Sequence, residues 1–262
     1  MNTITFPNLN LNFQLSQIAT TILGIDIYWY AICIVFGIIL AIILAFTSKE
    51  KFGIKFEDLI DILITAIIFG IIGARLYYVV FNIDYYISNP ARILQLRDGG
   101  LSIIGALILG GIGIIFRAKK LELKPLDLFD YIVPFVALAQ SIGRWGNFFN
   151  IEAYGTETNS FFKMGIKTLE GYKEVHPTFF YESICTFVIF CILRILQKKR
   201  KFRGQILWLY LILYSIIRFF IEGLRADSLM FSGYKITQII SLITVIYASY
   251  MYNKSKKYVK NK

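Results

Sequence analysis

One stretch gathers polar side chains where a long apolar run ends. Residues 143–155 hold Arg144, Asn147, Asn150 and Glu152. A guanidinium beside two amides and a carboxylate can hold an anion. The plain alternative is a helix end with an interfacial tryptophan. We favour a functional site, because polar groups this close to hydrocarbon are costly and usually mark function.

Four arginines lie inside or at the ends of apolar runs. Arg194 joins the basic cluster at a cytoplasmic end, which leaves Arg75, Arg144 and Arg218. Snorkelling to the membrane surface explains any one of them. Three at one depth, in the outer half of their expected helices, are better explained by an anionic ligand near the outer leaflet. Three acidic residues flank the same level and could pair with them: Asp98, Glu152 and Glu222. The sequence therefore predicts an outer-facing anion site, with a phospholipid headgroup as the obvious anion.

The cysteines and the histidine predict no metal site. Cys33, Cys185 and Cys191 all lie inside apolar runs, where packing is a better explanation than a disulfide or a metal-ligand set. His176 is the only histidine, and no cysteine pair has ligand spacing, which argues against structural zinc. We therefore expect no metal and no other cofactor.

The elements that must position these residues are predicted to be membrane-spanning helices. Apolar residues make up 56% of the 262 residues, and charged residues only 17%, which is low for a soluble protein. The apolar runs are long and continuous, unlike the short alternating strands of a membrane β-barrel. We expect an all-α fold, a polytopic membrane helical bundle that forms one integral membrane domain over residues 1–262.

The apolar runs predict about seven transmembrane helices. They cover approximately residues 22–46, 59–81, 101–116, 126–142, 178–196, 206–221 and 236–252. The one sizeable polar insertion lies between the fourth and fifth runs, at residues 148–177, and is predicted to form a small outward-facing head.

Basic residues predict the orientation of the spans. With the N-terminus outside, the cytoplasmic pieces carry 17 Lys and Arg residues and the outer pieces carry 7. Because cytoplasmic loops carry the excess of basic residues, we place the C-terminus and residues 197–203 in the cytoplasm. The net charge of +11 then faces anionic inner-leaflet lipid, and no nucleic-acid partner is expected.

Small residues recur at intervals of four on two of the predicted helices. They are Ala66, Gly70 and Ala74 on the second run and Ser102, Ala106 and Gly110 on the third. This spacing lets helix backbones approach closely, so plain helix packing is favoured. Room for an acyl chain is the alternative.

The stretch at residues 143–155 resembles the motif of the prolipoprotein diacylglyceryl transferases, Gly-Arg-x-Gly-Asn-Phe-x-Asn-x-Glu-x-x-Gly. Five further groups resemble this family's motifs and follow its order over nearly the whole chain. They are Trp29-Tyr30; Gly73-Ala74-Arg75 with Tyr78; Arg97-Asp98-Gly99-Gly100-Leu101-Ser102; His176-Pro177-Thr178 with Tyr181-Glu182; and Tyr214, Arg218, Glu222 and Arg225.

The resemblance implies a reaction in a bacterial cell membrane, the first step of lipoprotein maturation. A diacylglyceryl group moves from phosphatidylglycerol to the lipobox cysteine thiol in a prolipoprotein signal peptide. A thioether forms and glycerol phosphate leaves. The expected partners are therefore phosphatidylglycerol, prolipoprotein signal peptides and the lipid bilayer. The nucleophile belongs to the substrate, so the enzyme needs no catalytic cysteine.

The resemblance also implies roles for individual residues. The expected catalytic residues are Arg144, Arg218, Asn147 and Glu152. The arginines would hold the phosphodiester and stabilise the charge of the leaving group. Tyr30 would donate to the headgroup or act as an interfacial anchor. The residues expected to bind phosphatidylglycerol are Arg144, Arg75, Tyr30, Asn150, Asp98, Glu222 and Gly155.

One position departs from the family pattern. Many members have a histidine four residues after the Gly99-Gly100 pair, proposed as the general base, and here that position is Ile104. Either the reaction does not need this base or the chain has lost it. We favour the first, because a thiol beside two arginines has a lowered pKa. A structural role is favoured for His176, which precedes a proline at a helix start.

Two other functions use the same arginines. A multi-pass transporter or flippase for an anionic lipid would show an inverted repeat or paired broken helices, and we find neither in the sequence. A phosphatidyltransferase would require a metal-binding aspartate cluster, which we also do not find. Transfer of the diacylglyceryl group is therefore the favoured function.

Overall fold

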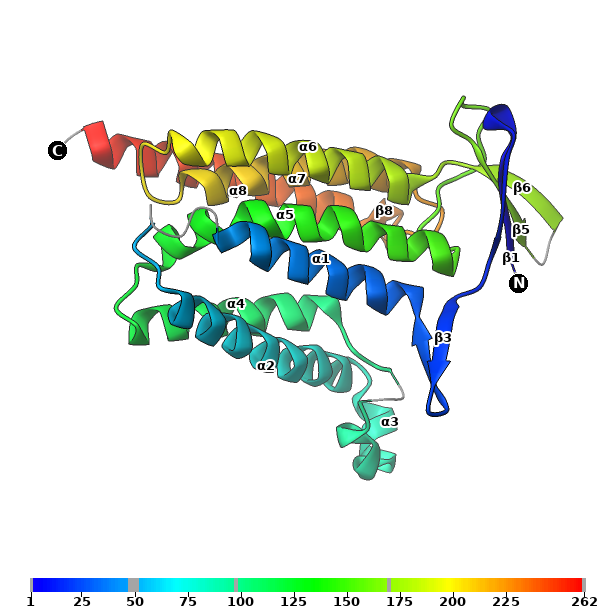
Figure 1. The fold of residues 1–262 in the computed structure, drawn as a ribbon, viewed down its shortest axis with the longest axis horizontal. Helices are drawn as coiled ribbons and strands as arrows, with labels where there is room; N and C mark the ends of the chain where they lie inside the picture. The colour runs from blue at the N-terminus through cyan, green and yellow to red at the C-terminus, as the bar shows by residue number, and fades with distance from the viewer. Residues whose placement is uncertain (1, 47–51, 97–98, 169–170, 261–262) are drawn as a thin grey trace. The chain divides into compact units, whose positions relative to one another are not determined.

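The structure is a computed structural model that describes residues 2–46, 52–96, 99–168 and 171–260. Seven long helices fill most of this part of the chain, one in each predicted apolar run (Figure 1). They are α1 (Trp29–Ala45), α2 (Phe56–Phe81), α4 (Ile103–Lys120), α5 (Pro125–Asn150), α6 (Thr178–Lys198), α7 (Gln205–Leu224) and α8 (Ile236–Lys260). The chain forms two compact units, residues 1–47 with 129–262, and residues 48–128.

The expectation of a helical membrane protein is confirmed at this level. Within the described ranges, four helices are long and apolar enough to cross a membrane, namely α2, α5, α6 and α7, and α1 is a shorter apolar helix. Many large apolar side chains on the helices are exposed, such as Phe36, Ile68 and Ile195, as expected for surfaces that face lipid. The finer prediction of seven spans stays a prediction.

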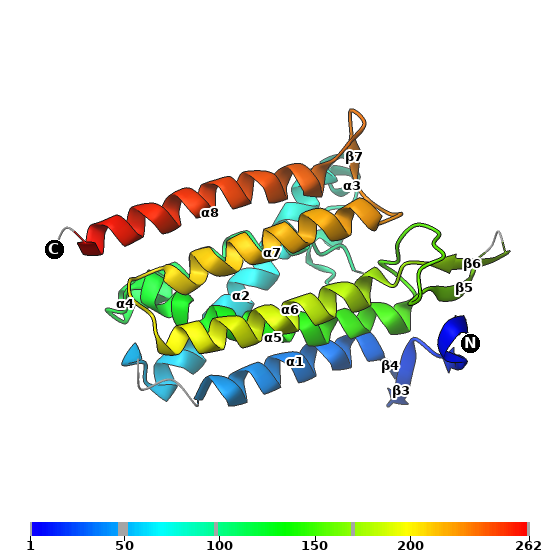
Figure 2. The ribbon, with the colours of Figure 1, turned by 90° about the horizontal axis from the view of Figure 1, so that it is seen from above.

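In the first unit, α5, α6 and α7 form the apolar core of the bundle. Val133 and Ala137 of α5 pack with Ile189 and Leu193 of α6 and with Ile206 of α7. Figures 1 and 2 show these three helices side by side, with α8 along α7. Ser141 and Ser183 each donate a 2.8 Å hydrogen bond to the other's carbonyl. Those bonds bring α5 and α6 close together.

A buried carboxylate fixes the start of α7. Asp130, on the second turn of α5, is fully buried. Its Oδ1 accepts from the backbone N–H groups of Ile206 and Leu207, both at 2.9 Å. Its Oδ2 accepts from the N–H of Gly204 at 2.7 Å and from Arg200 at 3.0 Å. The first N–H groups of a helix have no acceptor within the helix itself. Here the carboxylate of Asp130, on the neighbouring helix α5, is the acceptor for these N–H groups of α7.

The head contains strands, so the all-α expectation is wrong there. A four-stranded sheet has the order β2-β1-β5-β6, with β1 (Asn2–Phe6), β2 (Leu11–Leu15), β5 (Met164–Thr168) and β6 (Gly171–Val175). Every neighbouring pair is antiparallel. Ile4, Met164, Ile166 and Val175 bury one face of the sheet against Phe148 and Phe179. The head therefore combines the N-terminal segment with the polar insertion.

The first helix starts later than its apolar run predicted. Residues 18–28 form a hairpin of β3 (Ile18–Ile22) and β4 (Ile25–Tyr28), and α1 begins at Trp29. Leu23 and Gly24 link the strands with φ of 51° and 77°, and two positive φ values in a row suit a tight hairpin. The β-branched residues before this turn favour a strand. Hydropathy alone could not show that this part of the apolar run is a strand and not the start of the helix.

The second unit is built on the close crossing of α2 and α4. A Cβ added to Gly73 would collide with the backbone of Gly105, and one added to Gly105 with the backbone of Gly73. Gly110 and Gly70 also lie at this crossing, with Ala66 O and Ala106 O as their nearest neighbours. The predicted close packing is confirmed, although the tightest contact lies outside the predicted stripes. The short helices α3 (Ile83–Ser88) and η3 (Pro90–Leu94) follow α2.

Candidate active site

The polar stretch at residues 143–155 lies mostly on the helix α5. The apolar run predicted that this helix would end near residue 142, before the stretch, so that boundary is corrected. The helix α5 continues to Asn150, so Arg144 and Asn147 face the same side, three residues apart. Arg144 Nη1 donates to Asn147 Oδ1 at 3.4 Å. The helix then stops at Ile151 and Ala153, which have positive φ of 51° and 55°. The polar groups are therefore held by a regular backbone.

Glu152 turns back towards the end of α5. Its backbone N–H donates to Asn147 O at 3.1 Å. Its Oε1 accepts from Asn147 Nδ2 at 2.8 Å and from Asn150 Nδ2 at 3.4 Å. Four predicted site residues, Arg144, Asn147, Asn150 and Glu152, are thus connected by hydrogen bonds.

A carboxylate from the next helix holds two arginines. Glu182 is on α6 and is buried. Its Oε1 lies 2.6 Å from Arg144 Nη2, and its Oε2 lies 3.1 Å from Arg218 Nη1 on α7. Tyr214 donates its hydroxyl to Glu182 Oε1 at 3.1 Å. Three helices therefore meet at one carboxylate, in a low-dielectric setting where charged hydrogen bonds are strong.

A second buried carboxylate completes the pairing of Arg218. Arg218 Nη2 lies 2.6 Å from Glu222 Oε2, one turn along α7. This contact is an ion pair between opposite charges. Its geometry is not that of a hydrogen bond, and none of the described residues donates a hydrogen bond to Glu222 Oε2. The two arginines are thus balanced by Glu182 and Glu222. A buried cation without such partners would be costly.

The network leaves Arg144 able to bind a further group. Among the described residues, Arg144 donates to Glu182 and, more weakly, to Asn147, and it also interacts with the Tyr214 hydroxyl; a guanidinium has five N–H donors. Its side chain is 26% exposed, whereas that of Arg218 is 13% exposed. Arg144 can therefore contact an anion directly, with Arg218 behind it adding positive charge.

Tyr30 lies against the same end of α5. A Cβ added to Gly146 would come within 2.6 Å of the Tyr30 ring, so glycine is needed to seat the tyrosine there. Tyr30 is close enough to Glu152 and Arg144 to interact with both charges. Trp29 stacks on Phe149 with ring centroids 5.0 Å apart. This placement is compatible with both expected roles, headgroup donor and interfacial anchor.

Gly155 joins the head to the helix ends. Its N–H donates to His176 O at 2.8 Å. A Cβ at this position would lie 2.7 Å from His176 Cβ and 2.8 Å from Leu224 O. The structure therefore gives Gly155 a close-packing position between the start of α6 and the end of α7.

His176 lies in the head, before α6. Its Nδ1 is 3.3 Å from the hydroxyl of Tyr181. Burial lowers the pKa of His176 below its usual value of about 6.5. At neutral pH the imidazole is therefore mostly uncharged. Its backbone bonds to Gly155 and Thr156 give it a structural position whatever its side chain does.

The remaining predicted residues belong to the second unit or lie outside the description. Arg75 is buried there, and all five of its N–H donors go to main-chain carbonyls, those of Arg92, Ile93, Gln95, Gly99 and Gly100. Ile104 is exposed on α4. Asp98 lies outside the described residues. The structure thus brings together Arg144, Arg218 and their neighbours in the first unit, with Arg75 in a different environment.

Glu182 and Tyr214 belong to the network, although they were named only in the groups that resemble the family's motifs and not among the expected site residues. Glu182 lies four residues into α6, and an ionisable residue in an apolar helix is by itself a functional candidate. The same reasoning that selected Arg144 and Arg218 would have selected it. Tyr214 does not stand out by its residue type, because tyrosine is common in apolar helices, and its signal was its place in the group Tyr214, Arg218, Glu222 and Arg225 that resembles the family's motif.

Comparisons with known proteins agree over most of the chain. A family model described as prolipoprotein diacylglyceryl transferase matches residues 17–253. A protein of Clostridioides difficile named phosphatidylglycerol–prolipoprotein diacylglyceryl transferase is 48% identical over 234 residues, which cover 88% of this chain and 92% of that protein. Proteins of the same name from Clostridium novyi and Finegoldia magna are 45% and 43% identical, covering 95% and 94% of this chain and 98% of each relative. The matched residues include every member of the charge network.

Proposed function

The chain belongs to the prolipoprotein diacylglyceryl transferase family, and we propose that it moves the diacylglyceryl group of phosphatidylglycerol to the lipobox cysteine of prolipoproteins. The observation that carries this proposal is the pair Arg144 and Arg218, held 2.6 and 3.1 Å from the two oxygens of Glu182. Two guanidinium groups fixed in this way can receive a phosphodiester without reorganising. The protein would act in a bacterial cell membrane, on signal peptides as acceptors.

The arrangement suits a displacement at carbon. The sulfur of the acceptor thiolate forms a bond to the glycerol carbon of the diacylglyceryl group. The bond from that carbon to the phosphate oxygen breaks, and glycerol phosphate leaves with the electron pair. The thiol proton is lost to water or to the departing phosphate. Arg144 contacts the phosphate and, with Arg218, stabilises the negative charge that grows on the leaving oxygen.

Neighbouring groups would bind and orient the donor lipid. Asn147 and Asn150 both donate to Glu152 and can exchange these bonds for bonds to headgroup oxygens. Glu152 would accept from a glycerol hydroxyl, and Tyr30 would donate to the headgroup. Glu222 would act through Arg218 by keeping its guanidinium in place. Gly155 would act by letting the head pack on the ends of α6 and α7.

A reconstituted transfer assay tests this proposal. The purified protein is incubated with phosphatidylglycerol and a labelled lipobox peptide, and the peptide is examined by mass spectrometry. We expect a mass increase of one diacylglyceryl group through a thioether, and none when cysteine is replaced by serine in the peptide. A protein that moves phosphatidylglycerol across vesicles but never modifies the peptide would support the transporter instead.

Replacing the arginines tests their part in the reaction. Arg144→Ala and Arg218→Ala should each lower the transfer rate by about 10²–10³-fold, the size of losing one preorganised donor to a developing oxyanion. Lys in place of Arg144 should restore little, because a point charge cannot copy a planar fork. Lys167→Ala, an exposed charge change in the head, is the matched control. Near-normal transfer by Arg144→Ala would contradict the proposed site.

A further inference from the structure

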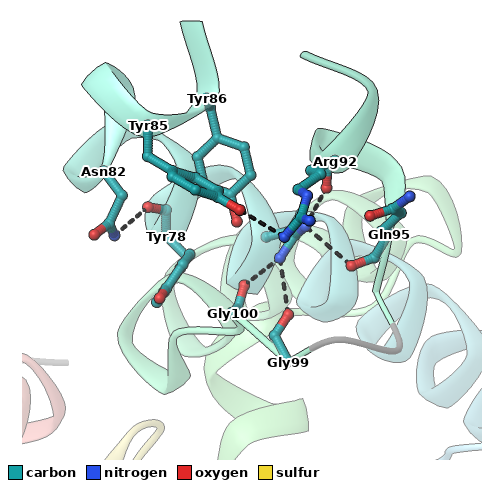
Figure 3. Close-up of a pocket in the computed structure, with 9 residues that line it drawn as sticks. Tyr78, Asn82, Tyr85, Tyr86, Arg92, Gln95, Gly99 and Gly100 are labelled. Atoms are coloured by element: carbon teal, nitrogen blue, oxygen red, sulfur yellow. Dashed lines mark hydrogen bonds between the residues drawn. The ribbon is translucent and has the colours of Figure 1, made fainter. Parts of the chain in front are cut away.

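Arg75 shows how the protein itself can satisfy a polar side chain inside an apolar helix. All five of its N–H donors go to main-chain carbonyls. Figure 3 shows the carbonyls of Gly99 and Gly100 bonded in this way. A donor without an acceptor is costly in an apolar setting. An unused donor inside an apolar helix therefore indicates that a ligand supplies the acceptor.

Gln140 of α5 has such an unused donor group. Its Oε1 accepts from the Tyr210 hydroxyl at 2.7 Å, but neither N–H of its amide has an acceptor among the described residues. The residue is half-buried, in a helix that is long and apolar enough to cross a membrane. The two N–H groups of this amide are therefore available to a ligand that carries an acceptor.

Tyr210 connects Gln140 to the charge network. The Tyr210 ring stacks on that of Tyr214, with ring centroids 5.7 Å apart and an interplanar angle of 12°. Tyr214 donates to Glu182 Oε1 at 3.1 Å, and the same oxygen contacts Arg144. The oxygen of Gln140 is thus used to fix its side chain beside the network, which leaves its nitrogen to bind.

Gln140 lies one helical turn deeper in the bundle than Arg144. Four residues separate them, which is about 6 Å along α5 and places both on the same side of the helix. Phe148, beyond Arg144 on α5, packs against the head sheet, so Gln140 is further from the head. In a glycerophospholipid the ester carbonyls lie only a few bonds from the phosphate, towards the acyl chains. A lipid whose phosphate contacts Arg144 would therefore bring an ester carbonyl to the depth of Gln140.

We propose that the amide of Gln140 donates a hydrogen bond to an ester carbonyl of the diacylglyceryl group. This inference rests on the proposed function, from which it takes the phosphate at Arg144. An amide N–H suits an uncharged carbonyl, as a guanidinium suits a phosphate. The reacting carbon lies between the two groups that are held. Gln140 therefore orients that carbon for attack by the thiolate.

Ester-linked and ether-linked donors test this contact in the full-length protein. Phosphatidylglycerol with ester-linked chains is compared with phosphatidylglycerol whose chains have the same length but ether links, and so no carbonyl. The measurement is kcat/KM for transfer to a lipobox peptide from each donor. We expect wild-type protein to use the ester-linked donor about tenfold better, the size of one hydrogen bond whose donor is otherwise left unpaired.

The wild-type result separates the two proposals. Equal use of the two donors would overturn the contact at Gln140 and leave the proposed function standing. No transfer from the ester-linked donor would overturn the proposed function, and this contact with it.

Gln140→Leu shows whether the preference arises at this residue. A residue that only joins α5 to α7 would lower transfer from both donors equally when replaced, and the preference would stay. We expect Gln140→Leu to remove the preference for the ester-linked donor, and a preserved preference would overturn the proposal. Gln140→Met, which has a side chain of similar length without an N–H, should give the same result and replaces Gln140→Leu if that variant does not fold.

Gln238→Leu is the matched control. Its amide also links two helices, since Gln238 Nε2 on α8 donates to Phe219 O on α7 at 3.1 Å. We expect this variant to keep the preference for the ester-linked donor. A preference lost in Gln238→Leu as well would show that it does not depend on a contact with Gln140, and would overturn the proposal.

Discussion

Glu182 sets the geometry of two arginines at once, which makes it the most informative residue to change. In Glu182→Gln the side chain keeps its shape but loses its charge, so Arg144 and Arg218 lose their common partner. We expect the transfer rate at saturating phosphatidylglycerol to fall at least tenfold, because the guanidinium groups are no longer fixed for the leaving phosphate. The measurement is kcat and KM for transfer to a lipobox peptide.

The control for Glu182 separates positioning from folding. Glu182→Ala would leave two arginines without their partner in a buried site, which is strongly destabilising, whereas Glu182→Asp keeps the charge on a shorter chain. We expect Glu182→Asp to recover part of the rate that Glu182→Gln loses. If Glu182→Gln folds normally and transfers at the wild-type rate, the carboxylate does not position the arginines.

The pH dependence of transfer distinguishes a thiolate from an imidazole base. With Ile104 at the family's histidine position, we expect the rate to rise towards the thiol pKa of about 8.5 or somewhat below it. Burial lowers the pKa of His176, so a base at that residue would give an inflection below about 6.5. A pH–rate profile of wild type and His176→Gln measures this, and the variant should lose only modest activity.

The range of this experiment follows from the same pKa. Because the folded-state pKa of His176 lies below its unfolded value, the unfolded chain takes up the proton first as the pH falls. The head therefore loses stability below about pH 6.5 and keeps it above. The scan must extend below pH 6.5 to cover an inflection from His176, and folding of the protein is checked at each of those lower pH values. A His176→Gln protein that inserts correctly but is inactive, and whose profile has lost an inflection below about pH 6.5, would identify His176 as the base.

At the scale of elements, the crossing of α2 and α4 depends on one pair of glycines. Gly105→Ala would push a methyl group into the backbone of Gly73, and overpacking of this kind costs about 1–3 kcal/mol. Gly111 is on the same helix with nothing within 4 Å of an added Cβ, so Gly111→Ala should be neutral or slightly stabilising. Thermal unfolding in detergent compares the two. Equal melting temperatures would show that the helices are not in close contact.

Helices were predictable from the sequence, whereas strands were not. Every long apolar run contains a helix, because lipid leaves few other ways to satisfy the backbone. The pairing of β1 with β5, such as Ile4 with Ile166, joins residues far apart in the chain and has no local signal. The same distinction between local and long-range signals applies to the candidate site. Arg144 and Arg218 stand out in apolar runs, but their link through Glu182 required the fold.

At the scale of the whole molecule, the head sheet bears on membrane topology. β1 belongs to the N-terminal segment and β5 and β6 to the insertion at residues 148–177, and one sheet contains all three. These two segments must therefore lie on the same side of a membrane. The charge bias predicts that this side is outside, since the pieces predicted to be cytoplasmic carry 17 basic residues against 7 in the outer pieces.

Cysteine accessibility tests this orientation. In a variant with Cys33, Cys185 and Cys191 replaced by alanine, a single cysteine is placed at Tyr172, which is 56% exposed in the head, or at Lys199, which follows the end of α6. A membrane-impermeant maleimide applied to intact cells should label Tyr172→Cys at once. It should label Lys199→Cys only after the cells are opened, because the basic cluster at residues 197–203 is predicted to lie in the cytoplasm. Labelling of Lys199→Cys in intact cells would reverse the topology and would place Arg144, Arg218 and the head on the cytoplasmic side, away from the signal peptides that the proposed reaction requires.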